Sequence, residues 1–173
     1  RVRDDYSDLD LDGIDLSRER IEKISRVTLV ACGTAWHACL TGKYMIEQLA
    51  GIPWEVDLAS EFRYRGPILD PSCLVIPVSQ SGETADTLAA LREGRRQGSR
   101  VVAVCNVRDA TIARESHDVL YTHAGPEIGV ASTKAFTTQV VALYMLAIKL
   151  AVASGRLDPD ARRERLAELM RLP

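Results

Sequence analysis

The sequence predicts an α/β fold in which a parallel sheet is covered by helices. Three apolar runs carry this prediction, at 27–31, 73–78 and 100–105. Each run is apolar at successive positions rather than at alternate ones, which is typical of strands buried on both faces, and such strands belong to parallel sheets. Helical segments follow the first two runs, to about residues 50 and 97, as right-handed β-α-β crossovers require.

The remaining strands and short helices have weaker patterns. Residues 54–58 alternate between apolar and polar side chains, and residues 118–121 form a fourth apolar run, so we expect a strand at each. Short helices are expected at 17–24 and near 111–115. Pro77 lies inside the second apolar run, and because proline cannot donate to a strand ladder we expect a bulge or the end of the strand there.

A long apolar segment at 131–153 predicts a helix at the centre of the domain or at an interface with another subunit or domain. Its most apolar stretch, 140–153, is too short for a membrane span and contains Lys149, so we expect no membrane insertion. Pro159 starts a charged final helix. These patterns divide the chain into a loose leader at 1–16, a domain at 17–155 and a C-terminal helix or linker at 156–173.

Composition argues against several classes of protein. Lys and Arg total 22 and Asp and Glu total 24, so a net charge of −2 gives no electrostatic reason to expect nucleic acid or an anionic membrane as partner. The four cysteines form no C-x-x-C pair and no zinc-like spacing with the three histidines, which favours reduced thiols in a cytoplasmic protein over a metal site or disulfides. The first twenty residues are polar and acidic, unlike a signal peptide.

The strongest local motif is Ser79-Gln80-Ser81-Gly82-Glu83-Thr84, between an apolar strand and an amphipathic helix. In a parallel sheet, ligands bind beyond the carboxyl ends of the strands, and a helix N-terminus there offers free N–H groups and a positive dipole end to an anion. The hydroxyls of Ser79, Ser81 and Thr84 add donors, and Gly82 allows close approach of the backbone. The motif therefore indicates phosphate binding, with the alternative that Ser81 merely caps the helix.

Two further segments lead from a strand or loop into a helix. Residues 32–35, Cys-Gly-Thr-Ala, lack the G-x-G-x-x-G pattern and the P-loop lysine, which argues against a dinucleotide or nucleoside triphosphate cofactor. On their own they are a turn with a cap. Residues 129–134 enter the long helix, which Ser132 or Thr133 could cap, while Lys134 could neutralise a phosphate or lie in solvent.

Together these segments resemble the glutamine:fructose-6-phosphate aminotransferase family. The serine motif alone is typical of the wider sugar isomerase (SIS) domain superfamily, whereas 61–65 and 129–139 narrow the resemblance to the aminotransferases. It extends from about residue 27 to about residue 150. The segments that carry it are 31–34, 59–65, 79–84 and 127–139.

The resemblance implies a three-layer α/β/α sandwich of flavodoxin-like type, two such domains in each isomerase region, and a homodimer. It implies that the ligand is fructose 6-phosphate or glucosamine 6-phosphate. The residues it assigns to the phosphate are Ser79, Gln80, Ser81 and Thr84, and those it assigns to the sugar are Thr34, Val130 and Ser132.

The resemblance also implies that the catalytic groups lie in other parts of such enzymes. The glutaminase cysteine belongs to a separate domain, and the isomerising acid and base and the Schiff-base lysine belong to the second SIS half and the C-terminal tail. We therefore expect no catalytic residue here and no synthesis of glucosamine 6-phosphate by this chain alone. Ala35 stands where many relatives carry serine, so a hydroxyl contact is missing or supplied otherwise, as by water.

Two other functions stay open on the sequence. A stand-alone SIS sensor of sugar phosphates would bind the ligand without chemistry. A small phosphosugar isomerase would need its own catalytic groups near the sugar, and Glu61 and Glu127 are the acidic residues that could be examined for this role.

Overall fold

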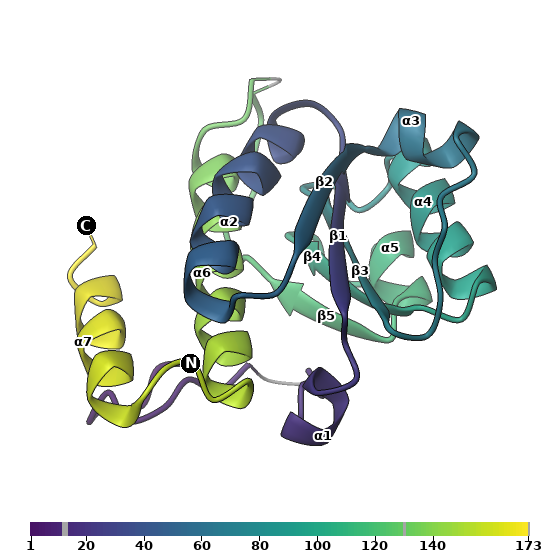
Figure 1. Ribbon diagram of the computed structural model, residues 1–173. Coiled ribbons are helices and arrows are strands. Elements are labelled where there is room, and N and C mark those ends of the chain that lie inside the picture. The colour runs from purple at the N-terminus through teal and green to yellow at the C-terminus, as the bar shows by residue number, and fades with distance from the viewer. Residues whose placement is uncertain (12–13, 130, 173) are drawn as a thin grey trace.

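A single twisted sheet lies at the centre of the structure (Figure 1). The computed structural model describes residues 1–11, 14–129 and 131–172. Within these residues the sheet has five strands, and every neighbouring pair is parallel. The strands are β1 (Arg26–Ala31), β2 (Trp54–Leu58), β3 (Cys73–Ser79), β4 (Arg100–Cys105) and β5 (Asp118–Tyr121). Their order across the sheet is β2-β1-β3-β4-β5.

The three apolar runs of the sequence form the three central strands, as predicted. β3 is buried at every position, and β1 and β4 are buried at every position after the first. The edge strands β2 and β5 are less completely buried. Helices cover both faces of the central strands, which is why apolar side chains occur there at successive positions.

Pro77 lies inside β3, and the expected bulge is absent. Before the proline, Leu74 pairs with Arg100 of β4. After it, Val78 pairs with Val104 in the same register. Because proline has no N–H, the ladder toward β4 is interrupted at this point without any shift of the strands.

The helices form two layers, one on each face of the sheet (Figure 1). One layer contains α2 (Gly33–Ala50) and α6 (Lys134–Ala153), and the other contains α3 (Ala59–Tyr64), α4 (Ala85–Arg96) and α5 (Thr111–Glu115). Each layer encloses its own apolar core, one beneath α2 and α6 and one beneath α3, α4 and α5. The predicted three-layer α/β/α fold is confirmed.

The long helix α6 begins at Lys134, three residues later than the sequence indicated. By length and composition it could cross a membrane, but half of its apolar window is buried within the protein. Leu143, Leu146 and Leu150 are fully buried in the core that α6 shares with α2. This burial places α6 in the core of the domain, which is the first of the two positions expected from the sequence.

The first eleven residues are not loose, and the expectation of a loose leader needs correction here. Leu9 and Leu11 are buried in the core beneath α2 and α6. The Lys149 ammonium of α6 donates to the Leu9 carbonyl oxygen at 2.9 Å. The signal available in the sequence was the presence of apolar leucines within an acidic segment. Such a segment can keep its acidic side chains in water while it buries its leucines.

The two terminal helices match the expectations from the sequence to different degrees. α1 (Arg18–Ile21) is shorter than the 17–24 helix expected from the sequence. α7 (Pro159–Leu169) forms the predicted final helix, and Asp158 caps it by accepting from the amides of Asp160 and Ala161 at 2.9 Å each. Where the domain ends, and whether α7 leads toward a second domain, stay predictions.

Candidate functional site

The candidate site lies at the carboxyl edge of the sheet, between β1 and β3. The chain leaves β1 for β2 on one side and reaches β3, β4 and β5 on the other, so the connections after β1 and β3 diverge. Such a topological switch point is where open parallel sheets bind ligands. A pocket of about 160 Å³ opens there. It is lined by Cys32, Thr34, Ala35, Val78, Ser79, Gln80, Ser81, Thr84, Thr87 and Gln139.

The hydroxyl-bearing residues of the serine motif line this pocket. Ser79 is the last residue of β3 and is buried, and its Oγ accepts a hydrogen bond from the Gly82 amide at 3.0 Å. The same Oγ lies 3.5 Å from Oγ1 of Thr84. The loop therefore folds back on itself and holds two hydroxyls side by side at the end of the strand.

Ser81 is not the cap of the following helix. Its Oγ accepts from the Glu83 amide at 3.3 Å, within the loop, whereas the N-cap position of α4 is Thr84. No side chain caps α4, so the amides of its first turn remain available. The positive end of a 12-residue helix thus faces the pocket with free N–H donors, which suits an anion.

Gly82 allows the loop to pack closely against the neighbouring helix α5. Its φ of +69° lies in the left-handed region, and its carbonyl oxygen accepts from the Ile112 amide at 3.0 Å. A Cβ at this position would lie 2.5 Å from Cβ of Ala110 and 2.8 Å from Cγ2 of Ile112. Both the conformation and the close packing therefore require glycine here.

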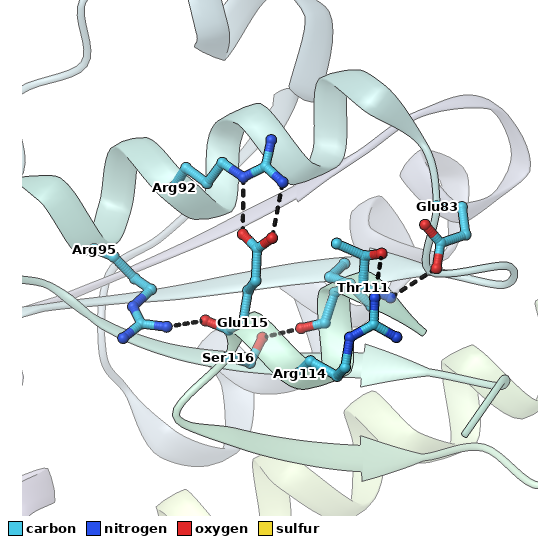
Figure 2. A network of polar contacts seen from close by, with 8 residues as sticks. Glu83, Arg92, Arg95, Thr111, Arg114, Glu115 and Ser116 are labelled. Carbon is cyan, nitrogen blue, oxygen red and sulfur yellow. Dashed lines mark hydrogen bonds and ion pairs between the residues drawn. The ribbon is translucent and has the colours of Figure 1, made fainter. Parts of the chain in front are cut away.

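The Glu83 carboxylate ties the same loop to the start of α5 (Figure 2). Its Oε1 accepts from the Thr111 amide at 2.7 Å, and Arg114 donates to Oγ1 of Thr111 at 2.9 Å. Farther along, Arg92 of α4 makes two hydrogen bonds of 2.8 Å to the Glu115 carboxylate, which joins α4 to α5. Contacts with α5 thus fix the position of the serine motif.

The Glu83 contact predicts a specific acid sensitivity. The Thr111 amide holds the pKa of Glu83 below its ordinary value of 4.5, so the contact stabilises the fold while the carboxylate is ionised. A depressed pKa means that this stabilisation is complete above about 4.5 and is lost as the pH falls through the lower folded value. Glu83→Gln should weaken the pH dependence of stability in that acidic window, as measured by urea unfolding between pH 7 and about 3. An unchanged pH profile would contradict the assignment.

The segment after β1 brings a second helix N-terminus to the pocket. α2 begins at Gly33, its N-cap is Cys32, and no side chain caps it. Thr34, which the resemblance assigns to the sugar, is half-buried and lines the pocket. The Ala35 methyl group also lines it, so the hydroxyl that many relatives carry there is absent from the wall.

The segment before α6 is arranged differently from the expectation. Glu127 accepts from the amides of Thr133 and Ala135 at 3.2 and 3.1 Å and so caps α6, whereas Thr133, the N-cap residue, makes no side-chain cap. Ser132 is not among the pocket-lining residues, and Val130 lies outside the residues that the structure describes. The Ala135 amide lowers the pKa of Glu127, which suits a cap better than a catalytic base.

A larger hollow of about 470 Å³ lies at the opposite, amino edge of the sheet, beside the starts of β3 and β4. It carries three cationic side chains, but each has a carboxylate partner. Arg20 pairs with Asp15 at 2.6 Å and Lys23 with Glu19 at 3.0 Å. The third, Arg100, pairs with Asp118. Because these charges are already neutralised, this hollow is a weaker anion site than the serine motif.

Two polar residues of the pocket were missed by sequence reasoning. Thr87 lies in the first turn of α4, one turn beyond the serine motif, and Gln139 is the only polar residue among the buried positions of α6. A polar side chain on the apolar face of a helix is the signal that could have pointed to Gln139. Among the described residues, no group of three or more His, Cys, Asp or Glu side chains could hold a metal ion.

The fold and this pocket define a parallel α/β domain with a candidate anion-binding pocket at its switch point. The chain belongs to the SIS domain family, whose model matches residues 20–149. It is 57% identical over 166 residues to the glutamine–fructose-6-phosphate aminotransferase (isomerizing) of Clostridium tetani, and 58% identical over 163 residues to that of Symbiobacterium thermophilum. These alignments cover 96% and 94% of this chain but 27% of each relative, so the chain spans about a quarter of their length.

A solved structure supports the same assignment. The C-terminal domain of glucosamine-fructose-6-phosphate aminotransferase from Francisella tularensis superposes with a TM-score of 0.88 at 41% sequence identity. The match covers 95% of this chain and 46% of that one. The resemblance inferred from the serine motif and the flanking segments is therefore confirmed.

Proposed function

We propose that this chain is the sugar-phosphate-binding half of the isomerase region of a glutamine:fructose-6-phosphate aminotransferase. Such an enzyme converts fructose 6-phosphate and glutamine to glucosamine 6-phosphate and glutamate. The observation that carries the proposal is the uncapped N-terminus of α4 facing a pocket lined by hydroxyl groups at the switch point of the sheet. The high identity to aminotransferases along almost the whole chain supports it.

In this proposal the serine motif holds the phosphate, through Ser79, Gln80, Ser81 and Thr84. Among the described residues, no lysine or arginine lines the pocket, so the backbone amides, the hydroxyls and the helix dipole would supply the attraction. Each charge-assisted hydrogen bond to a phosphate oxygen is worth about 1.5–3 kcal/mol when desolvated. Thr34, Val130 and Ser132 would contact the sugar.

Replacing Ser81 by alanine should weaken binding of glucosamine 6-phosphate about tenfold or more, because one hydrogen bond to the phosphate is removed. The helix should be little affected, since Ser81 does not cap α4. Titration calorimetry on wild type and variant measures the difference, with glucosamine as a ligand lacking the phosphate. Ser154→Ala, which lies at the end of α6, is the matched control. Unchanged affinity together with lower thermal stability would mean that Ser81 is structural.

We further propose that the protein is a cytoplasmic homodimer. An apolar groove of about 270 Å³ lies between α2, α6 and α7, and Tyr144 and Leu169 are among its lining residues. A second subunit or domain covering such a surface would remove it from water. Sedimentation should therefore show a dimer, or else a hydrophobic dye should bind to the uncovered groove of the monomer. A monomer that binds no hydrophobic dye would contradict the prediction.

A further inference from the structure

Two residues that line the pocket each have a buried polar atom without a hydrogen-bond partner. The atoms are Oγ1 of Thr87 and Oε1 of Gln139, and neither has a partner among the residues that the structure describes. Thr87 is 1% exposed and Gln139 is 2% exposed. A buried donor or acceptor left unpaired destabilises a protein, so each such atom in a folded chain calls for an explanation.

The two side chains reach the pocket from opposite layers of the fold. Thr87 comes from α4 on one face of the sheet, and Gln139 comes from α6 on the other. Both meet where the loops after β1 and β3 separate, beside the serine motif. Their convergence on one small pocket is explained if a bound molecule completes their hydrogen bonds.

We infer that Thr87 and Gln139 are further ligand-binding residues of this pocket, with Thr87 hydrogen-bonded to the phosphate and Gln139 to a neutral hydroxyl group of the sugar. The inference rests on the proposed function. Thr87 follows the serine motif in the first turn of α4, and its hydroxyl can donate to an anionic oxygen. The Gln139 amide finds its partner in a sugar hydroxyl whichever way the amide is turned, since a hydroxyl both donates and accepts.

The experiment uses isosteric apolar replacements in the purified 173-residue chain. The variants are Thr87→Val and Gln139→Leu. Thr28→Val is the matched control, because Oγ1 of Thr28 in β1 is equally buried and unpaired but does not line the pocket. The Tm of the free protein and the Kd values for glucosamine 6-phosphate and inorganic phosphate are measured for each.

All three variants should keep or raise the Tm of the free protein, because each removes an unpaired buried polar atom. Thr87→Val should weaken binding of both ligands about tenfold. Gln139→Leu should weaken binding of glucosamine 6-phosphate about tenfold and leave inorganic phosphate unchanged. Thr28→Val should change neither affinity.

Other outcomes overturn the inference in distinguishable ways. If wild type binds glucosamine 6-phosphate and both pocket variants bind it equally well, Thr87 and Gln139 are structural and the proposed function stands. Equal weakening of both ligands by Gln139→Leu would overturn the assignment of Gln139 to the sugar. If wild type binds neither ligand, the proposed function fails and this inference fails with it.

Discussion

Replacement of Gly82 by alanine should lower the free energy of unfolding by about 2–5 kcal/mol. The left-handed φ of +69° costs a residue with a side chain about 1–2 kcal/mol. The added Cβ would also press on Ala110, Ile112 and Cys105 at 2.5–2.9 Å, and overpacking of this kind costs about 1–3 kcal/mol more. Urea unfolding of wild type and variant, with the slope checked for constancy, measures the sum.

Gly125→Ala separates the two contributions. Gly125 has the same φ of +69°, but a Cβ there would meet nothing within 4 Å. It should therefore show the conformational cost alone, about 1–2 kcal/mol. If both alanine variants lost the same free energy of unfolding, the loop at Gly82 would have moved to accommodate the new methyl group. The close packing of the serine motif against α5 would then be wrong.

Truncation of Ile112 to alanine should cost about 2–5 kcal/mol, because the side chain is fully buried and its removal leaves a cavity beneath the serine motif. Ile112→Val should cost about 0.5–1.5 kcal/mol. Since Ile112 supports Gly82, the alanine variant should also bind glucosamine 6-phosphate more weakly at temperatures where it remains folded. Chemical denaturation and calorimetry measure the two effects.

Ile46→Ala is the control for the effect on binding. Ile46 is fully buried in the other core, beneath α2 and α6. Its truncation should cause a similar loss of stability without a change in affinity. If both isoleucine variants lost affinity to the same extent, weaker binding would reflect a general loss of rigidity. It would not reflect the loss of packing between Ile112 and the serine motif.

The sequence was informative about the strands because their pattern is local. Successive apolar residues, as in β3, report burial on both faces and therefore a parallel sheet. It was less informative about ends of helices, because caps come from distant residues. Glu127 caps α6 from six residues before Thr133, and no capping pattern in the local sequence indicates this contact.

The residues of the candidate site likewise divide into those with a local sequence pattern and those whose contacts depend on the fold. The serine motif was predicted because glycine, hydroxyl residues and a following helix stand together in the sequence. Gln139 was missed because its position depends on the fold, which places a buried amide of α6 in the wall of the same pocket as Thr34. The support of the loop by Glu83 and Thr111 is likewise a contact between residues that lie apart in the chain.

We propose above all that the start of α4 binds the phosphate of a sugar phosphate. Chemical-shift mapping of the isotope-labelled chain during titration with glucosamine 6-phosphate tests it most directly. We expect the largest amide shifts between Gln80 and Thr87, a further shift at Thr34, and far smaller shifts with glucosamine. Shifts gathered instead around Arg20, Lys23 and Arg100, in the hollow at the amino edge of the sheet, would contradict it.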